Sequence, residues 1–151
     1  MTIKIRRKPI PLYQCLVPAG SLDADTRASL AEAITTVHTS VISVPRIFVN
    51  VVFIEYDPTA YFTGGRRATV SSIIATIREG FGDAVRSELL TRLCDSWSSI
   101  TGQDRRRVTV SLDEVDASSR MEGGMILPSF GDEAIWARAH AHELAELGWR
   151  D

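Results

Sequence analysis

The sequence predicts an α+β fold in which two tandem β-α-β units form a four-stranded sheet with two helices on one face. Three observations lead to this prediction: the chain repeats itself, each repeat holds a stripe of apolar residues at helical spacing, and strand-like apolar segments flank each stripe. Two strands joined by such a helix pair in parallel through a right-handed crossover. With 151 residues, the chain is long enough to bury the core of one domain.

The repeat relates residues 11–65 to residues 70–124 by a constant shift of 59 positions without a gap. Ten of the 55 aligned pairs are identical, where ordinary residue frequencies give about three or four. The pairs include Arg27 with Arg86, and Gly64-Gly65 with Gly123-Gly124. The repeat divides the chain into an N-terminal extension at 1–10 and a single domain at 11–151, which ends in a helical tail at 131–149.

In the first unit we expect a strand at Leu12–Val17, a helix from Asp23 or Asp25 to Ser40, and a strand at Ile47–Tyr56. Aspartates at the start of the helix accept hydrogen bonds from its free N–H groups. The apolar side chains of the helix form one stripe that faces the sheet; they are Leu30, Ile34, Val37 and Val41.

The second unit repeats this pattern with a strand at Thr69–Ile77, a helix at Asp83–Ile100 and a strand at Arg107–Val115. Gly102 ends the helix, because glycine readily takes the left-handed conformation that follows a helix C-terminus. The apolar stripe of this helix consists of Leu89, Leu93, Trp97 and Ile100.

The second strand of each unit is apolar on both sides, so the sheet face opposite the helices is expected to be apolar and uncovered. An exposed apolar area of that size indicates contact with another subunit. From Asp132 onward the tail is helix-like, and a loose stripe predicts that it packs on the edge of the assembly; the stripe is Ile135, Ala139, Leu144 and Leu147.

Composition excludes several functional classes. A net charge of −2 and a pI near 5.9 argue against nucleic-acid or membrane partners. Cys15 and Cys94 have no paired spacing, which fits a reducing compartment, and we expect a cytoplasmic protein. We expect no cofactor and no metal, since His140 and His142 lack ligand spacing. The basic segment Lys4–Lys8 alternates with isoleucines and suggests an arm that adds a strand to a neighbouring subunit.

Four short stretches occur in the order found in one known family. They are Pro11-Leu12-Tyr13, Ala33–His38, Ile77–Gly80 and Arg120–Pro128. Through them the chain resembles the tautomerase superfamily, and in particular cis-3-chloroacrylic acid dehalogenase-like proteins. The resemblance implies a tautomerase-type fold, a homotrimer whose sheets face inward, and a small carbonyl or carboxylate substrate.

The resemblance also implies roles for individual residues. Pro11 stands where the family has its catalytic N-terminal proline, and Glu122 stands where a glutamate activates water. His38 and Arg78 match groups that bind the substrate carboxylate or carbonyl. The second substrate-binding arginine of the family falls on Phe81, and a nearby tyrosine falls on Ser111, so this chain departs from the family at both substrate-binding positions.

The largest departure concerns Pro11, because residue 10 precedes it and makes its nitrogen a tertiary amide without basicity. The sequence therefore predicts a keto–enol isomerase or a hydratase/dehalogenase-like enzyme whose proline chemistry is impaired, with weak or no dehalogenase activity. Two alternatives stay open: a non-catalytic trimeric ligand-binding or scaffold protein, and an enzyme that uses Glu122 or Cys15 in place of the amine. Purely structural roles also remain for each residue, such as a strand-opening Pro11 or a helix-end His38 favoured by the dipole.

Overall fold

The computed structural model describes residues 11–42, 44–129 and 131–148. The predicted arm at Lys4–Lys8 lies outside the described residues. The strands and helices follow one another as β1 (Leu12–Pro18), α1 (Ala24–Val41), β2 (Asn50–Tyr56), β3 (Phe62–Thr63), β4 (Arg66–Arg67), β5 (Ser71–Arg78), α2 (Asp83–Thr101), β6 (Val108–Val115), β7 (Met121–Glu122), β8 (Met125–Ile126), α3 (Glu133–Ala139) and α4 (Ala141–Glu146). Three short 3-10 helices lie between them: η1 (Arg46–Phe48), η2 (Arg105–Arg107) and η3 (Ala117–Ser119).

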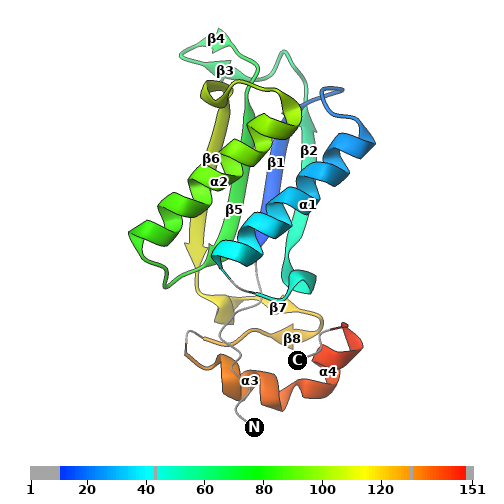
Figure 1. Ribbon diagram of the computed structural model, residues 1–151, viewed down its shortest axis with the longest axis vertical. Helices are drawn as coiled ribbons and strands as arrows, with labels where there is room; N and C mark the ends of the chain where they lie inside the picture. The colour runs from blue at the N-terminus through cyan, green and yellow to red at the C-terminus, as the bar shows by residue number, and fades with distance from the viewer. Residues whose placement is uncertain (1–10, 43, 130, 149–151) are drawn as a thin grey trace.

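One four-stranded sheet organises the molecule, with the strand order β2-β1-β5-β6. The outer pairs β1–β2 and β5–β6 are parallel, whereas the central pair β1–β5 is antiparallel. Helices α1 and α2 lie side by side on one face of this sheet (Figure 1). The arrangement confirms the predicted α+β fold of two β-α-β units. No helix among the described residues is long and apolar enough to cross a membrane.

The two helices begin and end where the capping residues indicate. The side chain of Asp23 accepts a hydrogen bond from the Thr26 N–H at 2.7 Å, so Asp23 rather than Asp25 is the N-cap of α1. Gly102 ends α2 in the left-handed conformation, with a φ of 73°. Between the helices and the sheet lies the main core, which includes Tyr13, Leu30, Ile73, Leu89 and Trp97.

The predicted second strand began too early. Ile47 and Phe48 belong to η1 rather than to a strand, and β2 begins at Asn50. The N–H groups of Phe48 and Val49 donate to the carbonyl oxygens of Pro45 and Arg46, at 3.1 and 3.0 Å, so this turn withholds them from a strand ladder. As a result, η1 lies at one end of the sheet, beside the start of β1.

The gapless repeat also needs a correction in its first strands. Helix positions match at the shift of 59, as Leu30 does with Leu89. Along β1 and β5, however, the side chains that face the helices match at a shift of 60; the pairs are Tyr13 with Ile73, Cys15 with Ala75, and Val17 with Ile77. Five residues separate β1 from α1, and four separate β5 from α2. The turn between β5 and α2 is one residue shorter than the turn between β1 and α1, and this accounts for the change of shift from 60 to 59.

The face of the sheet opposite the helices carries apolar side chains at its β2 edge, where Val52 is 42% and Ile54 is 40% exposed. The predicted apolar face is therefore present. Along β6 the same face is polar and exposed, with Thr109, Ser111 and Asp113, so the apolar area is confined to a part of the sheet.

The C-terminal tail forms two short helices, α3 and α4, with a break at His140. They lie below the end of the sheet at which β1 begins, together with the β7–β8 hairpin (Figure 1). Ala137 and Leu144 pack there with Phe48 and Met125. The predicted apolar stripe is wrong in part, because the break changes which side chains face inward and leaves Ile135 66% exposed.

Candidate functional site

The end of the sheet that holds the start of β1 brings several of the predicted residues together. Pro11 is buried, and its carbonyl oxygen accepts a hydrogen bond from the N–H of Asn50 at 3.1 Å. The start of β1 is thereby fixed beside the start of β2, where Leu12 is in register with Asn50. The nitrogen of Pro11 is bonded to residue 10, so in this chain it carries no proton and has no basicity.

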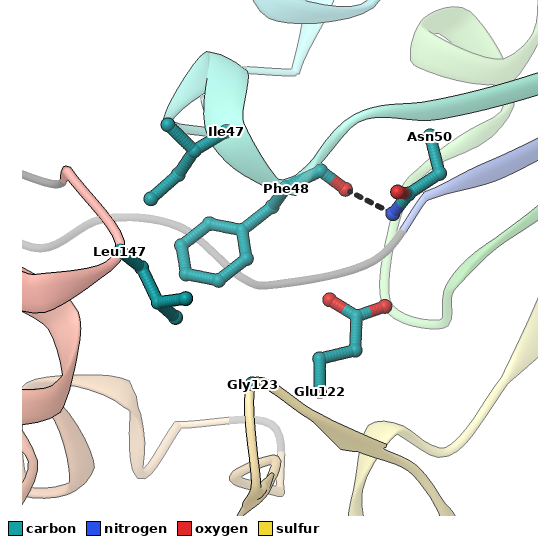
Figure 2. A pocket seen from close by; sticks show the side chains of 6 residues that line it. All are labelled: Ile47, Phe48, Asn50, Glu122, Gly123 and Leu147. Atoms are coloured by element: carbon teal, nitrogen blue, oxygen red, sulfur yellow. Dashed lines mark hydrogen bonds between the residues drawn. The ribbon is translucent and has the colours of Figure 1, made fainter.

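A cavity of about 280 Å³ opens beside Asn50. Figure 2 shows the carboxylate of Glu122 directed into it from the β7–β8 hairpin, with Phe48 and Leu147 on the other side. The Asn50 side chain donates to the Phe48 carbonyl at 3.1 Å, which fixes its orientation. Small binding sites have this character, with apolar walls and few polar groups.

Gly123 lets the hairpin approach the C-terminal segment closely. Its φ of +57° favours glycine, and a Cβ at this position would lie only 2.6 Å from Cδ1 of Leu147. The side chain of Leu147 therefore lines the cavity next to the hairpin that carries Glu122.

His38 lies in the core, in the last turn of α1, and is not among the residues that line the cavity. Its Nδ1 is 2.6 Å from the hydroxyl oxygen of Tyr13, and its Nε2 is buried with no hydrogen-bond partner among the described residues. Burial lowers the pKa of His38 from 6.5 to about 4, so the ring is neutral at pH 7. Burial, and then the nearby thiol of Cys15, raise the pKa of Tyr13, which keeps its hydroxyl protonated.

Arg78, at the end of β5, also lies outside the lining of the cavity. Its Nη2 donates to the Pro128 carbonyl at 2.6 Å and lies 3.3 Å from Oε1 of Glu133. Its Nε and Nη1 are buried without hydrogen-bond partners among the described residues. Burial lowers the pKa of Arg78, while the carboxylate of Glu133 opposes that shift. The guanidinium is therefore held by the C-terminal segment.

The remaining predicted positions lie away from the cavity. Ser111 is exposed in the middle of β6, opposite Ile74 of β5. Phe81 packs against the main core, and its carbonyl accepts a hydrogen bond from Arg86 at 2.6 Å. Cys15 is buried in the same core, and burial raises the pKa of its thiol to about 12, so the reactive thiolate is suppressed.

Sequence reasoning did not identify the other residues that line the cavity, which are Ile47, Phe48, Asn50 and Leu147. One signal was available: Pro45 is a residue type that favours a turn just before Ile47. Asn50 is also a polar residue at the head of an otherwise apolar strand. Leu147 had no such signal, since only the packing of α4 against the β7–β8 hairpin brings it to the cavity.

Comparisons with known proteins agree with the fold. Residues 10–141 match the model of a family described as putative oxalocrotonate tautomerase enzymes. The crystal structure of a member of the cis-3-chloroacrylic acid dehalogenase family is 28% identical, with a TM-score of 0.83, and the match covers 91% of this chain and 98% of that one. The crystal structure of native Ps01740 is 38% identical over 74% of this chain and 99% of that one, with a TM-score of 0.71.

A fused 4-OT that forms an asymmetric trimer shares the fold at 20% identity, with a TM-score of 0.70 and coverage of 76% of this chain and 94% of that one. A comparison with curated proteins gave no significant match. The family match spans most of the chain, and the more similar structures extend over nearly all of their own length. The chain therefore belongs to the putative oxalocrotonate tautomerase family, within the tautomerase superfamily, and its fold resembles that of the cis-3-chloroacrylic acid dehalogenase family.

Proposed function

We propose that the protein is an enzyme of the tautomerase superfamily that acts on a small carbonyl or carboxylate compound, as a keto–enol isomerase or a hydratase/dehalogenase-like enzyme. The observation that carries this proposal is the carboxylate of Glu122, which enters a cavity beside Asn50, the residue that holds the Pro11 carbonyl. A volume of about 280 Å³ lies at the lower end of the range for ligand sites and suits a small substrate.

In this proposal Glu122 acts as a base or positions water, since a carboxylate beside a bound carbonyl compound can take a proton from carbon or from water. His38 is neutral at pH 7, and its buried Nε2, which has no hydrogen-bond partner among the described residues, supplies a hydrogen-bonding group at this end of the sheet. Arg78 supplies a positive charge at the same end. The positions of Phe81 and Ser111 support no contact with a ligand in the cavity.

Replacement of Glu122 with glutamine tests the role of the carboxylate. We expect E122Q to lower turnover of phenylpyruvate or 3-chloroacrylate by about 10²-fold or more, as loss of a general base does. The matched control is E143Q, which removes an exposed carboxylate from α4 and should leave turnover unchanged. Equal activity of E122Q and the unaltered protein would overturn the role of Glu122.

The proline chemistry of the family is impaired in the intact chain, because an amide nitrogen can neither accept nor deliver a proton. The family match begins at residue 10, which supports Pro11 as the family's proline position. A form of the protein that begins at Pro11 restores a secondary amine there. Turnover that appears only in this form would mean that the preceding residues mask a working site, whereas robust turnover by the intact chain would refute the impairment.

A homotrimer is the proposed assembly. The apolar side chains of Val52 and Ile54 on the uncovered face support it, as does the trimer formed by a fused 4-OT of the same fold. Sedimentation equilibrium measures the state directly, and a monomer at all accessible concentrations would contradict the proposal.

A non-catalytic trimeric ligand-binding or scaffold protein is the second candidate. It is favoured by the combination of an amide at Pro11 and an Arg78 already paired with Glu133. If both the intact chain and the form that begins at Pro11 bind a ligand without turnover, the protein is a binding or scaffold protein and not an enzyme.

A further inference from the structure

Arg78 is surrounded by oxygen atoms that belong to the chain itself. Its Nη2 lies 2.6 Å from the carbonyl oxygen of Pro128 and 3.3 Å from Oε1 of Glu133. Only 1% of the Arg78 side chain and 11% of the Glu133 side chain are exposed. Both partners follow the second repeat unit, so they are additions to the duplicated fold. A carboxylate is the group with which a substrate acid would pair at a guanidinium.

We propose that Glu133 is a specificity-determining residue, whose carboxylate is a built-in counter-ion for Arg78 and makes the site favour uncharged carbonyl compounds over carboxylates. The inference rests on the proposed function, which locates the site at this end of the sheet. Its addition is the substrate class, an uncharged carbonyl compound.

The charge balance around Arg78 supports this inference. Asp116, Glu79 and Asp132 also lie near enough to raise the pKa of Arg78, so several carboxylates of the described residues act on the guanidinium together with Glu133. A substrate carboxylate that approached it would meet repulsion from Glu133 and would have to displace that side chain.

The hydrogen-bonding capacity of Arg78 is not exhausted, however. Its Nε and Nη1 are buried and have no hydrogen-bond partner among the described residues. A buried donor without a partner is costly, and a carbonyl oxygen satisfies it without adding a second negative charge. Arg78 is therefore suited to donate to a neutral oxygen while Glu133 balances its charge.

Glu133 is also held in position by the backbone. Its Oε2 accepts a hydrogen bond from the N–H of Gly131 at 2.9 Å, and it is the first residue of α3. The packing of Ala137 and Trp136 beneath the sheet fixes that helix. The counter-ion is thus part of the folded C-terminal segment and does not depend on a bound ligand.

The test compares two probes of similar shape, pyruvate and its uncharged methyl ester, by calorimetric titration of the full chain. E133Q should tighten the binding of pyruvate relative to methyl pyruvate by about tenfold or more, and E133D, which keeps the charge, should restore the original ratio. E143Q is the matched control, because it removes an exposed carboxylate of α4 that is not among those that raise the pKa of Arg78, and it should change the ratio less than about twofold.

An unchanged ratio in E133Q, or an equal change in E143Q, would overturn the inference, and so would the absence of binding of both probes to every form. If E133Q does not fold, the two probes are compared on the unaltered protein. The inference requires methyl pyruvate to bind more tightly than pyruvate. Tighter binding of pyruvate would refute the role of Glu133 as a counter-ion. Turnover is not part of this readout. A protein that converts neither compound would therefore count against the proposed function while the binding ratio still tests the role of Glu133.

Discussion

The two ends of the sheet are built by equivalent parts of the two repeat units, yet they differ in chemistry. Because β1 and β5 are antiparallel, the start of β1 and the start of β5 lie at opposite ends. At the Pro11 end the last turn of α1 carries His38, and at the other end the equivalent position of α2 carries Trp97. The β7–β8 hairpin lies at the first end and the β3–β4 hairpin at the second (Figure 1).

The polar groups at the Trp97 end largely satisfy one another. Ser71 Oγ and Trp97 Nε1 both donate to the side-chain oxygen of Gln103, at 2.8 and 3.0 Å. Ser98 Oγ lacks a hydrogen-bond partner among the described residues there, but it is uncharged. At the Pro11 end an imidazole and a guanidinium have unmet hydrogen bonds within the described part of the chain, and α3 and α4 lie at this end. The two ends of the duplicated fold therefore differ. The Trp97 end has polar groups that mostly bond to one another, and we call it the structural end. The Pro11 end keeps polar groups that can bond to a ligand.

The largest expected effect belongs to the structural end. Replacing Trp97 with alanine should cost about 4 kcal/mol of unfolding free energy, because it removes a fully buried side chain from the main core. Urea unfolding measures the loss. In the folded fraction, the affinity for methyl pyruvate should stay within about twofold of that of the unaltered protein. A large loss of affinity for methyl pyruvate in this variant would show that the Trp97 end also takes part in ligand binding.

The next effect is a pH dependence that only the Pro11 end should show. Because burial holds the pKa of His38 near 4, the unfolded chain binds a proton below about pH 6.5 that the folded chain does not. Stability is therefore fully present above that pH and decreases as the pH falls toward 4, by up to about 3 kcal/mol. H38Q should flatten this slope, while H142Q, which removes an exposed imidazole, should leave it intact. If the stability of H38Q still decreased between about pH 6.5 and 4, the assignment of this pH dependence to His38 would be refuted.

The smallest expected difference is between two tyrosines, one at each end. Y13F leaves Nδ1 of His38 without its partner, and Y56F removes the hydroxyl that bonds to the backbone of Val70. Each should cost about 1 kcal/mol, the usual value for a hydrogen bond. Only Y13F should shift the NMR resonances of the His38 ring, and a similar shift in Y56F would show that the two ends are coupled.

Much of the fold could be predicted from the sequence because each element carries its own signal. The apolar stripes of both helices, the capping by Asp23 and the end at Gly102 are local features. The repeat predicted two parallel pairs in one four-stranded sheet, with a different shift needed only in the first strands, whereas the antiparallel pairing of β1 with β5 was not predicted. The break at His140 does not appear in the apolar periodicity, and the packing of Phe48 against Ala137 and Leu144 joins distant segments.

The candidate site could be predicted only in outline. Resemblance to the tautomerase superfamily led to Pro11, His38, Arg78 and Glu122, and the fold places all four near one end of the sheet. The resemblance could not indicate that the guanidinium of Arg78 pairs with Glu133, which lies 55 positions further along the sequence. The cavity wall at Leu147 also arises from tertiary contacts alone.

The central claim, that the Pro11 end is the functional end, is tested most directly by amide chemical shifts during titration of the full chain with methyl pyruvate. Asn50 and Gly123 line the cavity, while Ser71 and Gln103 report on the opposite end. The account predicts that the amide resonances of Asn50 and Gly123 shift and saturate while those of Ser71 and Gln103 stay unchanged. Saturating shifts at Ser71 and Gln103, with none at Asn50 and Gly123, would contradict it.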